Sequence, residues 1–519
     1  MRARPGTRST RAKDADRPGP ALLAPGTFWR KGRADRVSFL IDSEAYFAAA
    51  MSAIRRARHS ILLLGWGFDP RTRLRPGPEE VEGAADEIGN MLKSLANRRK
   101  DLDIRVLIWK SALPISASQQ FFPHRARAWF RGSPIRFRLD STVPYGACHH
   151  QKVLVVDDKI AFCGGGDFGV DRWDTTGHLD QDPRRIMPGG EHHPPRHEVM
   201  SLVDAEAARA LGDLARARWL RATGHGVPAP PPDVDHDPWP TWLTPDIRNA
   251  DVAITRTQPA WRGEPEVAEI EALHLESIRG ARRSIYLEHQ YFTSPLIGEA
   301  LAVRLEERDG PDVVLVSTRH SPSYFDRMTM DRTRADLLRR LWAADRYGRF
   351  RAYFPQTVAG RPIIVHSKVT IIDDRLVRIG SANLNNRSGG FDTECDIAIE
   401  SGNEAVAGAI SLFRANLIGH FTGAAPEEVE SVLRERGLAG GFDLLVRRSG
   451  GRLAPQAPVP MGPMVSLIAA YHLGDPTDAL DSWRPSLRRR RLAQQVLKIA
   501  QSGLGAAAVS GVSERKVDE

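Results

Sequence analysis

Short apolar runs alternate with longer amphipathic stretches along most of the chain. Runs rich in Val, Ile and Leu and bounded by polar residues or glycine are typical of buried strands. Stretches in which apolar residues recur every three or four positions are typical of helices that pack on one face. The predicted strands are 61–66, 103–109, 153–156, 198–203, 312–317, 369–372 and 394–399, and the predicted helices are 46–58, 84–97, 205–222 and 332–347. This alternation predicts an α/β fold with mixed sheets.

The pattern occurs twice. Residues 54–61, Ile-Arg-Arg-Ala-Arg-His-Ser-Ile, return 224 residues later at 278–285 as Ile-Arg-Gly-Ala-Arg-Arg-Ser-Ile. A whole unit is therefore duplicated, and we expect two mixed-sheet α/β sandwich halves related by a pseudo-twofold axis and sharing one active site. The predicted divisions are a disordered basic arm at 1–28, a first half at 29–227, a proline-rich linker at 228–246, a second half at 247–424, and a C-terminal extension with a basic segment at 425–519.

Two matching stretches, one in each half, carry the strongest chemical pattern. The first signature contains His150, Lys152 and Asp157, followed by Gly164-Gly165-Gly166-Asp167. The second signature contains His366, Lys368 and Asp373, followed by Gly380-Ser381-Ala382-Asn383. In both, Lys lies two residues after His, Asp five after Lys, and the first Gly seven after Asp. A lone His-x-Lys carries no meaning, but two copies with the same spacing indicate a function.

The signatures predict a site for an anion. Side chains on a strand alternate between its faces, so the His and the Lys of each signature project the same way. Lys is a compact cation, His titrates near neutral pH, and we expect the glycine turn to offer backbone N–H groups to a phosphate. Asp157 and Asp373 lie seven residues beyond their histidines. That odd separation places them on the opposite face, which predicts structural anchors rather than bases.

The twin pattern resembles the phospholipase D superfamily, whose signature is H-x-K-x4-D-x6-G-[GS]-x-N. The second copy matches fully and continues into Asn385, Arg387 and Ser388, whereas the first copy has Asp167 where the family usually has Asn. The resemblance implies that the two signatures form one active site that needs no metal or other cofactor. One His would attack phosphorus to give a phosphohistidine, and the other would protonate the leaving group.

Three further stretches narrow the resemblance, which spans about residues 35–422, to the lipid enzymes of the superfamily. Arg172-Trp-Asp-Thr175 resembles the family's R-[WY]-D-T, Glu288-His-Gln290-Tyr291-Phe292 its E-N-Q-Y-F, and the stretch from Pro195 to Val203 its W-H-D strand with Glu198 in place of Asp. The resemblance also implies that Glu198 and Glu394 orient the catalytic histidines, although the sequence leaves open which Glu serves which His.

The predicted site follows from these motifs. Its catalytic members are His150, Lys152, Asp157, His366, Lys368, Asp373, Glu198 and Glu394, with the two aspartates included as signature members. Its substrate-binding members are Gly164, Gly165, Asp167, Gly380, Ser381, Asn383, Gln290 and Tyr291. A phosphodiester would repel a carboxylate, so we expect Asp167 to turn away or to be held by a neighbouring cation. His150 is the expected nucleophile and His366 the acid–base group, an assignment that the pseudo-symmetry leaves open.

Composition limits the partners and the compartment. The 519 residues carry a formal charge of +9, which suits lipid headgroups, a membrane surface or nucleic acid. No apolar run is long enough to span a bilayer, and no secretory leader is apparent. The three cysteines, Cys148, Cys163 and Cys395, are expected to be buried thiols rather than disulfides. We therefore expect a cytoplasmic monomer that touches membranes peripherally, with export by a signal-less route as the alternative.

Two segments allow more than one structural interpretation. The aromatic residues within 111–134 are consistent with a lid, a membrane-touching loop or ordinary packing. The basic run 488–491 is expected to be a solvated tail, with binding of anionic lipid as the alternative.

The leading hypothesis is a phospholipase D-type phosphodiesterase that hydrolyses glycerophospholipids to phosphatidic acid or transfers the phosphatidyl group to another alcohol. Three alternatives stay open. A cardiolipin synthase-like phosphatidyltransferase would usually carry amino-terminal membrane helices. A nuclease of the same superfamily fits the charge, but the stretches at 172–175 and 288–292 favour a lipid substrate over nucleic acid. A non-catalytic phosphate-binding protein would not need an intact His and Lys in both copies.

Overall fold

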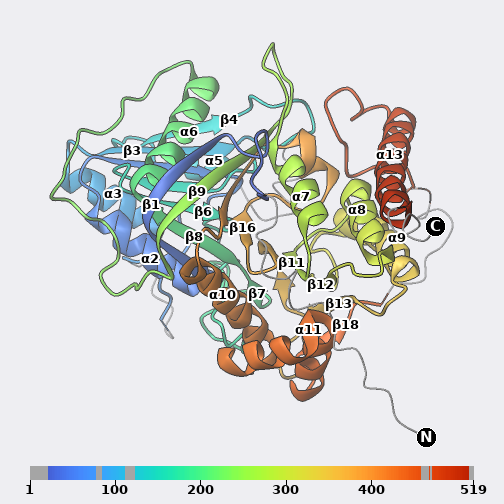
Figure 1. Ribbon diagram of the computed structural model, residues 1–519. Coiled ribbons are helices and arrows are strands. Elements are labelled where there is room, and N and C mark those ends of the chain that lie inside the picture. The colour runs from blue at the N-terminus through green and yellow to red at the C-terminus, as the bar shows by residue number, and fades with distance from the viewer. Residues whose placement is uncertain (1–20, 78–84, 112–122, 458–466, 468–469, 513–519) are drawn as a thin grey trace, which may run out of the picture.

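The computed structural model describes residues 21–77, 85–111, 123–457, 467 and 470–512. Its centre is one mixed β-sheet that runs through both halves of the chain (Figure 1). At the middle of this sheet, β1 (Arg30–Ile41) pairs with β9 (Ile247–Gln258) in antiparallel register. These are the first strands of the two halves. The halves therefore do not form separate sheets but meet edge to edge and continue as one.

The strands follow an equivalent order on both sides of this central pair. Outward from β1 lie β8 (Val199–Asp204), β6 (Ile160–Gly164), β5 (Val153–Val156), β2 (Ser60–Gly65), β3 (Asp103–Trp109) and β4 (Arg136–Asp140). Outward from β9 lie β17 (Glu394–Glu400), β16 (Leu376–Gly380), β15 (Lys368–Ile372), β11 (Ser284–His289), β12 (Asp312–Val316), β13 (Phe350–Pro355) and β18 (Leu453–Pro455), while β10 (Val267–Ala268) pairs with β9. The matching order confirms the predicted α/β fold.

Both faces of the sheet are buried, which explains why its strands read as continuous apolar runs. On β5, Val153 and Val155 face a core shared by both halves, whereas Leu154 and Val156 face a second core of the first half. Helices α6 (Ala205–Thr223), α10 (Glu404–Thr422) and α11 (Pro426–Arg448) cover the shared core. The opposite face is covered by α2 (Asp42–Arg56), α3 (Ile88–Arg98) and α5 (Pro123–Trp129) in the first half, and by α7 (Glu269–Gly280), α8 (Pro295–Glu306) and α9 (Tyr324–Ala344) in the second.

The predicted strands and helices fall on observed elements, with shifts at their ends. Helix α9 begins at Tyr324, eight residues before its predicted start, because the Ser323 side chain caps it by accepting from the N–H of Asp326. Part of the aromatic segment 111–134 lies outside the described residues. Within its described part, Phe130 is buried in the first-half core, which supports the packing interpretation there.

The predicted arm and linker need correction. Residues 1–20 lie outside the described part of the chain, but Leu22 and Leu23 are buried in the core of the second half and do not belong to a disordered arm. The proline-rich segment 228–246 is not a free spacer. His236 lies 2.8 Å from Asp157, and Trp239 is buried against the first half with its indole N–H donating to the Leu243 carbonyl. Proline here stiffens a segment that packs on the surface.

The predicted boundary at residue 424 is also wrong. Strand β18 adds to the edge of the second half by pairing with β13, and α11 packs on the shared core. Helix α13 (Pro485–Val512) packs against α8 (Figure 1). Within the basic run 488–491, Arg488 is buried and bonds Asp481, and Arg491 pairs with Asp478 at 2.7 Å. These two arginines are therefore structural rather than part of a solvated tail.

Two features relevant to the compartment follow from the described residues. Cys148, Cys163 and Cys395 are all buried free thiols, which confirms that prediction. Among the described helices, none is both long and apolar enough to cross a membrane.

Asp157 and Asp373 are the anchors that the alternation of faces predicts. Asp373 accepts hydrogen bonds from the backbone N–H groups of Arg282, Arg283 and Ser284, each at 2.6–2.7 Å. Asp157 accepts equivalent bonds at 2.7 Å from Arg58, His59 and Ser60. Each carboxylate thus fixes the loop that leads into a neighbouring strand. Their inclusion among the catalytic residues is therefore wrong.

We expect Asp373→Ala to lower the free energy of unfolding by about 3 kcal/mol, because three backbone N–H groups would lose a charged acceptor. Asp373→Asn should cost less, since Oδ1 alone accepts two of the three bonds. Urea unfolding would measure both variants, with Asp309→Ala on the exposed surface as the control. Equal stability of Asp373→Ala and the control would refute the anchoring role.

Candidate active site

Each signature histidine is held by a glutamate from the other half of the chain. Nδ1 of His150 lies 2.8 Å from Oε2 of Glu394, and Nδ1 of His366 lies 2.5 Å from Oε2 of Glu198. Because the carboxylate occupies Nδ1, it fixes the tautomer and the ring orientation and leaves Nε2 as the nitrogen that can react. The structure thus answers the question that the sequence left open, and the pairing is crossed.

Backbone hydrogen bonds between the halves explain the crossing. The N–H of His150 donates to the carbonyl of Thr393 at 3.0 Å, and the N–H of His366 donates to the carbonyl of His197 at 2.8 Å. In both cases the residue after the acceptor is the glutamate. Immediately before His366, β14 (Ile364–Val365) also pairs in parallel with β7 (Arg196–His197). Each half therefore brings its histidine to the other half's glutamate through the main chain.

Burial sets the protonation of these pairs. It is the main cause that raises the pKa of Glu394 to about 8 and that of Glu198 to about 7. Burial also lowers the pKa of both histidines, and the positive charges of Lys152 and Lys368 lower it further. Both shifts disfavour the charged forms, so near neutral pH each histidine is a neutral imidazole. When the imidazole proton is on Nδ1, directed at the glutamate, Nε2 carries a free lone pair, which is the form a nucleophile needs.

The two signature lysines have different partners. Lys152 Nζ lies 3.3 Å from Oδ2 of Asp167, and Lys368 Nζ donates to Oε1 of Gln290 at 3.3 Å. The other oxygen of Asp167 accepts from the backbone N–H groups of Trp66 and Gly67. The expectation that a cation holds Asp167 is therefore met. Of the two lysines, Lys368 has the neutral partner, and its charge is the less compensated.

The prediction that the turn amides bind phosphate is wrong, because the protein already uses them. The N–H of Gly165 donates to the Val199 carbonyl, and those of Ser381 and Ala382 donate to Asp396. Gly165 is needed for steric reasons instead, since a Cβ at this position would overlap Glu198 and crowd Lys368. A Cβ on Gly380 would overlap Asp396, and one on Gly164 would lie 2.5 Å from Met200 Sδ. Gly165 therefore makes room for the orienting Glu198, and Gly380 and Gly164 make room for Asp396 and Met200.

Two serines support the second orienting carboxylate. Ser381 Oγ donates to Oε2 of Glu394 at 2.5 Å, and Ser388 Oγ donates to Oε1 at 2.7 Å. Ser388 was not among the predicted site residues, although the match of the second signature extends to it. Gly165 occupies the position equivalent to Ser381, so the first half lacks this hydroxyl. The chemical surroundings of the two glutamates therefore differ.

The remaining predicted residues divide between the site and its surroundings. Asn383 is buried, and its Oδ1 has no hydrogen-bond partner among the described residues, so it remains available to a substrate. Tyr291 does not join the His-Lys groups through a hydrogen bond. Its hydroxyl donates to Asp326 on α9 at 3.1 Å, which makes it part of the wall next to the site.

Four other described residues could hold a metal ion, although no linear spacing indicated them. One donor atom from each of Asp42, His178, His197 and His420 lies within 4.8 Å of the others. Asp174 accepts from Nδ1 of His178 at 2.8 Å. Imidazole with carboxylate is a donor set that suits divalent transition ions. The same contacts hold His197 directly before Glu198, so this cluster also supports the orienting carboxylate.

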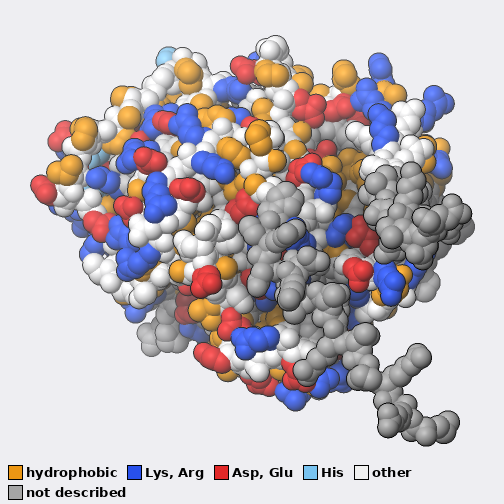
Figure 2. All heavy atoms as spheres, viewed as in Figure 1, with side chains coloured by type: hydrophobic (Ala, Val, Ile, Leu, Met, Phe, Trp, Pro, Cys, Tyr) orange, Lys and Arg blue, Asp and Glu red, His pale blue; other side chains and the backbone are white. Residues whose placement is uncertain are grey.

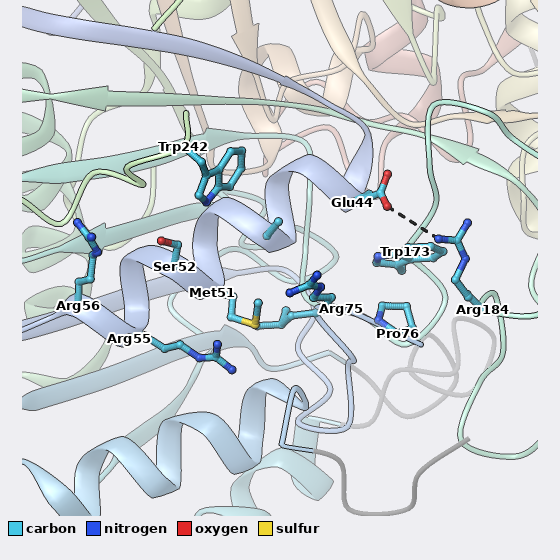
Figure 3. Close-up of a pocket in the computed structure, with 12 residues that line it drawn as sticks. Glu44, Met51, Ser52, Arg55, Arg56, Arg75, Pro76, Trp173, Arg184 and Trp242 are labelled. Carbon is cyan, nitrogen blue, oxygen red and sulfur yellow. Dashed lines mark ion pairs between the residues drawn. The ribbon is translucent and has the colours of Figure 1, made fainter. Parts of the chain in front are cut away.

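A separate pocket of about 780 Å³ lies along the outer face of α2 (Figure 3). Trp173 and Trp242 flank it, and Arg55 and Arg184 reach toward it. None of the predicted catalytic or substrate-binding residues lines it. The pocket is therefore distinct from the histidine site.

The crossed pairing predicts a specific spectroscopic result. We expect Glu394→Gln to move the ring ¹⁵N resonances of His150 and to leave those of His366 in place, because an amide cannot accept the Nδ1 proton as a carboxylate does. Glu198→Gln should do the reverse. Histidine-selective labelling, with assignment by His150→Ala and His366→Ala, would measure this. A shift confined to the histidine of the same half would contradict the crossing.

Comparisons with known proteins agree with this geometry. A family model described as "Cardiolipin synthase, PLD-like domain" matches residues 275–416. Phospholipase D A of Dictyostelium discoideum is 24% identical over 68% of this chain and 32% of its own length. Phospholipase D alpha 2 of Oryza sativa subsp. japonica is 25% identical over 75% of this chain and 63% of its own. Cardiolipin synthase A of Pseudomonas entomophila is 26% identical over 68% and 63%.

The fold has a counterpart among solved structures. The phosphatidylserine synthase of Haemophilus influenzae aligns with 79% of this chain and 94% of its own at a TM-score of 0.50, with 13% identity, which supports the fold alone. The chain spans about one third to two thirds of the length of the curated relatives just named. Together with the two signatures and their crossed glutamates, these matches show that the chain belongs to the phospholipase D superfamily.

Proposed function

We propose that the protein is a phospholipase D-type phosphodiesterase. It would hydrolyse glycerophospholipids to phosphatidic acid and a headgroup alcohol, and it would also transfer the phosphatidyl group to other alcohols. The observation that carries this proposal is the pair of histidines, each with Nδ1 on a buried glutamate and each followed two residues later by a lysine. That arrangement supplies a nucleophile, an acid and two cations for a phosphate.

The first step forms a phosphohistidine. Nε2 of His150 attacks phosphorus, the bond from phosphorus to the headgroup oxygen breaks, and His366 gives its proton to that oxygen. Binding of the anionic diester favours protonation of His366, because an opposite charge raises the pKa of a histidine. Lys152 and Lys368 stabilise the charge that develops on the phosphate oxygens.

The second step returns the enzyme to its starting state. His366 takes a proton from water or from an alcohol, and the resulting nucleophile attacks phosphorus. The bond from phosphorus to Nε2 of His150 breaks, and phosphatidic acid or a new phosphatidyl ester leaves. One chain supplies both histidines and both glutamates, so a monomer contains a complete set of these groups.

A phosphatidyltransferase is the second candidate, and one observation favours it. The family model that matches residues 275–416 carries the description of a cardiolipin synthase domain. Hydrolysis and transfer differ only in which hydroxyl attacks the phosphohistidine. The two candidates therefore share every step up to that intermediate.

We further propose that the protein contacts membranes peripherally through exposed aromatic side chains. Tyr145, five residues before His150, is 77% exposed and lies 5.5 Å from the ring of Trp483. Tyr324 and Phe325 are 77% and 61% exposed. They directly precede Asp326, which accepts the hydrogen bond from the Tyr291 hydroxyl. Aromatic rings of this kind suit the headgroup region of a bilayer. On the face shown in Figure 2, basic and acidic side chains are interspersed, so the net charge of +9 is not gathered there.

The covalent intermediate predicts capture by alcohol. Ethanol added to phospholipid vesicles should divert product from phosphatidic acid to phosphatidylethanol, with retention of configuration at phosphorus, because two displacements each invert it. Mass spectrometry of the products and a chiral thiophosphate substrate would measure this. His150→Ala and His366→Ala should each abolish turnover. Inversion together with no ethanol-derived product would rule out the two-step mechanism.

The lowered pKa of Lys368 predicts that activity declines at alkaline pH. Burial lowers the pKa of Lys368 to about 7, so above that pH the free enzyme loses the cation that holds the phosphate. We expect kcat/KM to fall about tenfold per pH unit well above this value. In Lys368→Arg the guanidinium stays charged, so activity should be lower at neutral pH but this decline should vanish. An unchanged decline in Lys368→Arg would assign it to another group.

A further inference from the structure

Two arginines lie near His366, whose pKa is lowered by burial, by the charge of Lys368 and by the positive charges of these arginines. Arg196 is buried, and the side chain of Arg172 is 12% exposed. Arg196 precedes Glu198, the glutamate that bonds His366, by two residues. The equivalent position in the second half, two residues before Glu394, is Asp392. At this point of the pseudo-symmetric frame the His366 side carries Arg196, whereas the His150 side carries Asp392, which pairs with Arg387 at 2.7 Å.

The donors of Arg196 are largely unused. Its side chain is 5% exposed, and Nη2 alone has a carboxylate partner, Asp171 at 3.2 Å. Nε and Nη1 are buried without a hydrogen-bond partner among the described residues. Leaving guanidinium N–H groups unsatisfied in the interior is costly, which points to a ligand that completes them.

A second arginine concentrates the charge. Arg172 lies 3.3 Å from the other oxygen of Asp171, so one carboxylate is shared by two guanidinium groups. Burial and the proximity of Arg172 lower the pKa of Arg196 to about 10. Two other carboxylates lie near the pair, but Glu198 already bonds His366 and Asp167 already pairs with Lys152. Among the described side chains, the two guanidinium groups thus share one carboxylate, Asp171, as their direct ionic partner. Arg196 also stands where the family strand described above has Trp, so this charge is a feature of this chain.

We propose that Arg196 and Arg172 form a subsite for a second anionic group of the substrate, a carboxylate or phosphate carried by the headgroup. The proposal rests on the proposed function and specifies its substrate class. In an in-line displacement the leaving group departs on the side opposite the nucleophile. With His150 attacking, the headgroup oxygen lies at His366, where the arginines are. A guanidinium fork matches the planar oxygens of a carboxylate or phosphate.

Short-chain lipids below their micellar concentration would test this without surface effects. The wild-type enzyme should turn over dihexanoyl phosphatidylserine and phosphatidylglycerol phosphate at least tenfold faster, by kcat/KM, than phosphatidylglycerol, whose headgroup is neutral. Arg196→Gln should remove that preference by lowering kcat/KM on the two anionic lipids about tenfold more than on phosphatidylglycerol. Arg196→Lys should restore part of it. Arg184→Gln is the matched control, because Arg184 lies in the same segment but pairs with Asp182.

The outcomes separate the alternatives. A preference for only one of the two anionic headgroups identifies the group as carboxylate or phosphate. An equal loss on all three lipids in Arg196→Gln would place Arg196 on the scissile phosphate or in support of Glu198 and would overturn the subsite. An unchanged preference would overturn it as well. If the wild-type enzyme turns over none of the three lipids, the result would count against the proposed function rather than against the subsite.

A binding measurement tests the subsite without turnover. O-phosphoserine and phosphoethanolamine differ by a single carboxylate. By titration calorimetry the wild-type protein should bind phosphoserine at least tenfold more tightly, and Arg196→Gln should bind the two equally. Equal binding by the wild type would show that the arginines do not recognise the carboxylate. Far-ultraviolet circular dichroism and the melting temperature of each variant would exclude loss of the fold as the cause.

Discussion

The hydrogen bond from each signature histidine to a glutamate of the other half is the interaction on which the rest of the site depends. Neither half contains a complete pair, because Glu394 serves His150 and Glu198 serves His366. The two halves must therefore stay fixed to within a fraction of an ångström. The β1–β9 pairing contributes to this, since it joins the strands of both halves into one continuous sheet.

The duplicated frame is nearly symmetric, but the chemistry placed on it is not. Glu394 receives two serine hydroxyls, whereas the equivalent surroundings of Glu198 contain Gly165 and a buried arginine. Lys152 faces a carboxylate, and Lys368 faces an amide. A two-step displacement needs one histidine to attack and the other to move protons. Differences in neighbouring charge can assign those roles without changing the backbone, because charge acts over several ångströms while the fold is set by packing.

Burial of so many ionisable groups is possible because they satisfy one another. His197 lies between Asp42 and Glu288, at 2.9 Å from each, and Ser367 and Tyr286 also donate to Glu288. A buried charge without a partner would cost several kcal/mol, whereas a connected network keeps its geometry. The network includes His197, the residue before Glu198, and so restricts the movement of the His366–Glu198 pair.

The sequence alone determined the two-half α/β architecture, the buried strands, and the histidines and lysines of the site. It could do so because strand periodicity and the twin signatures are local patterns. It also placed Asp157 and Asp373 as anchors, since alternation along a strand is a local rule as well. It failed at residues 21–28, because Leu22 is buried in the core of the distant second half, and at residues 425–457, because β18 adds to the edge of that half by pairing with β13.

Only the tertiary structure decided the crossed pairing, because His150 and Glu394 are 244 residues apart and no spacing encodes their contact. The same reason hid the group of Asp42, His178, His197 and His420, whose members come from both halves. For the same reason the sequence could not show that the backbone N–H groups of the turn after the second signature donate to Asp396 and not to a ligand. Local pattern fixes which groups a strand presents, whereas the packing of distant segments fixes what those groups meet.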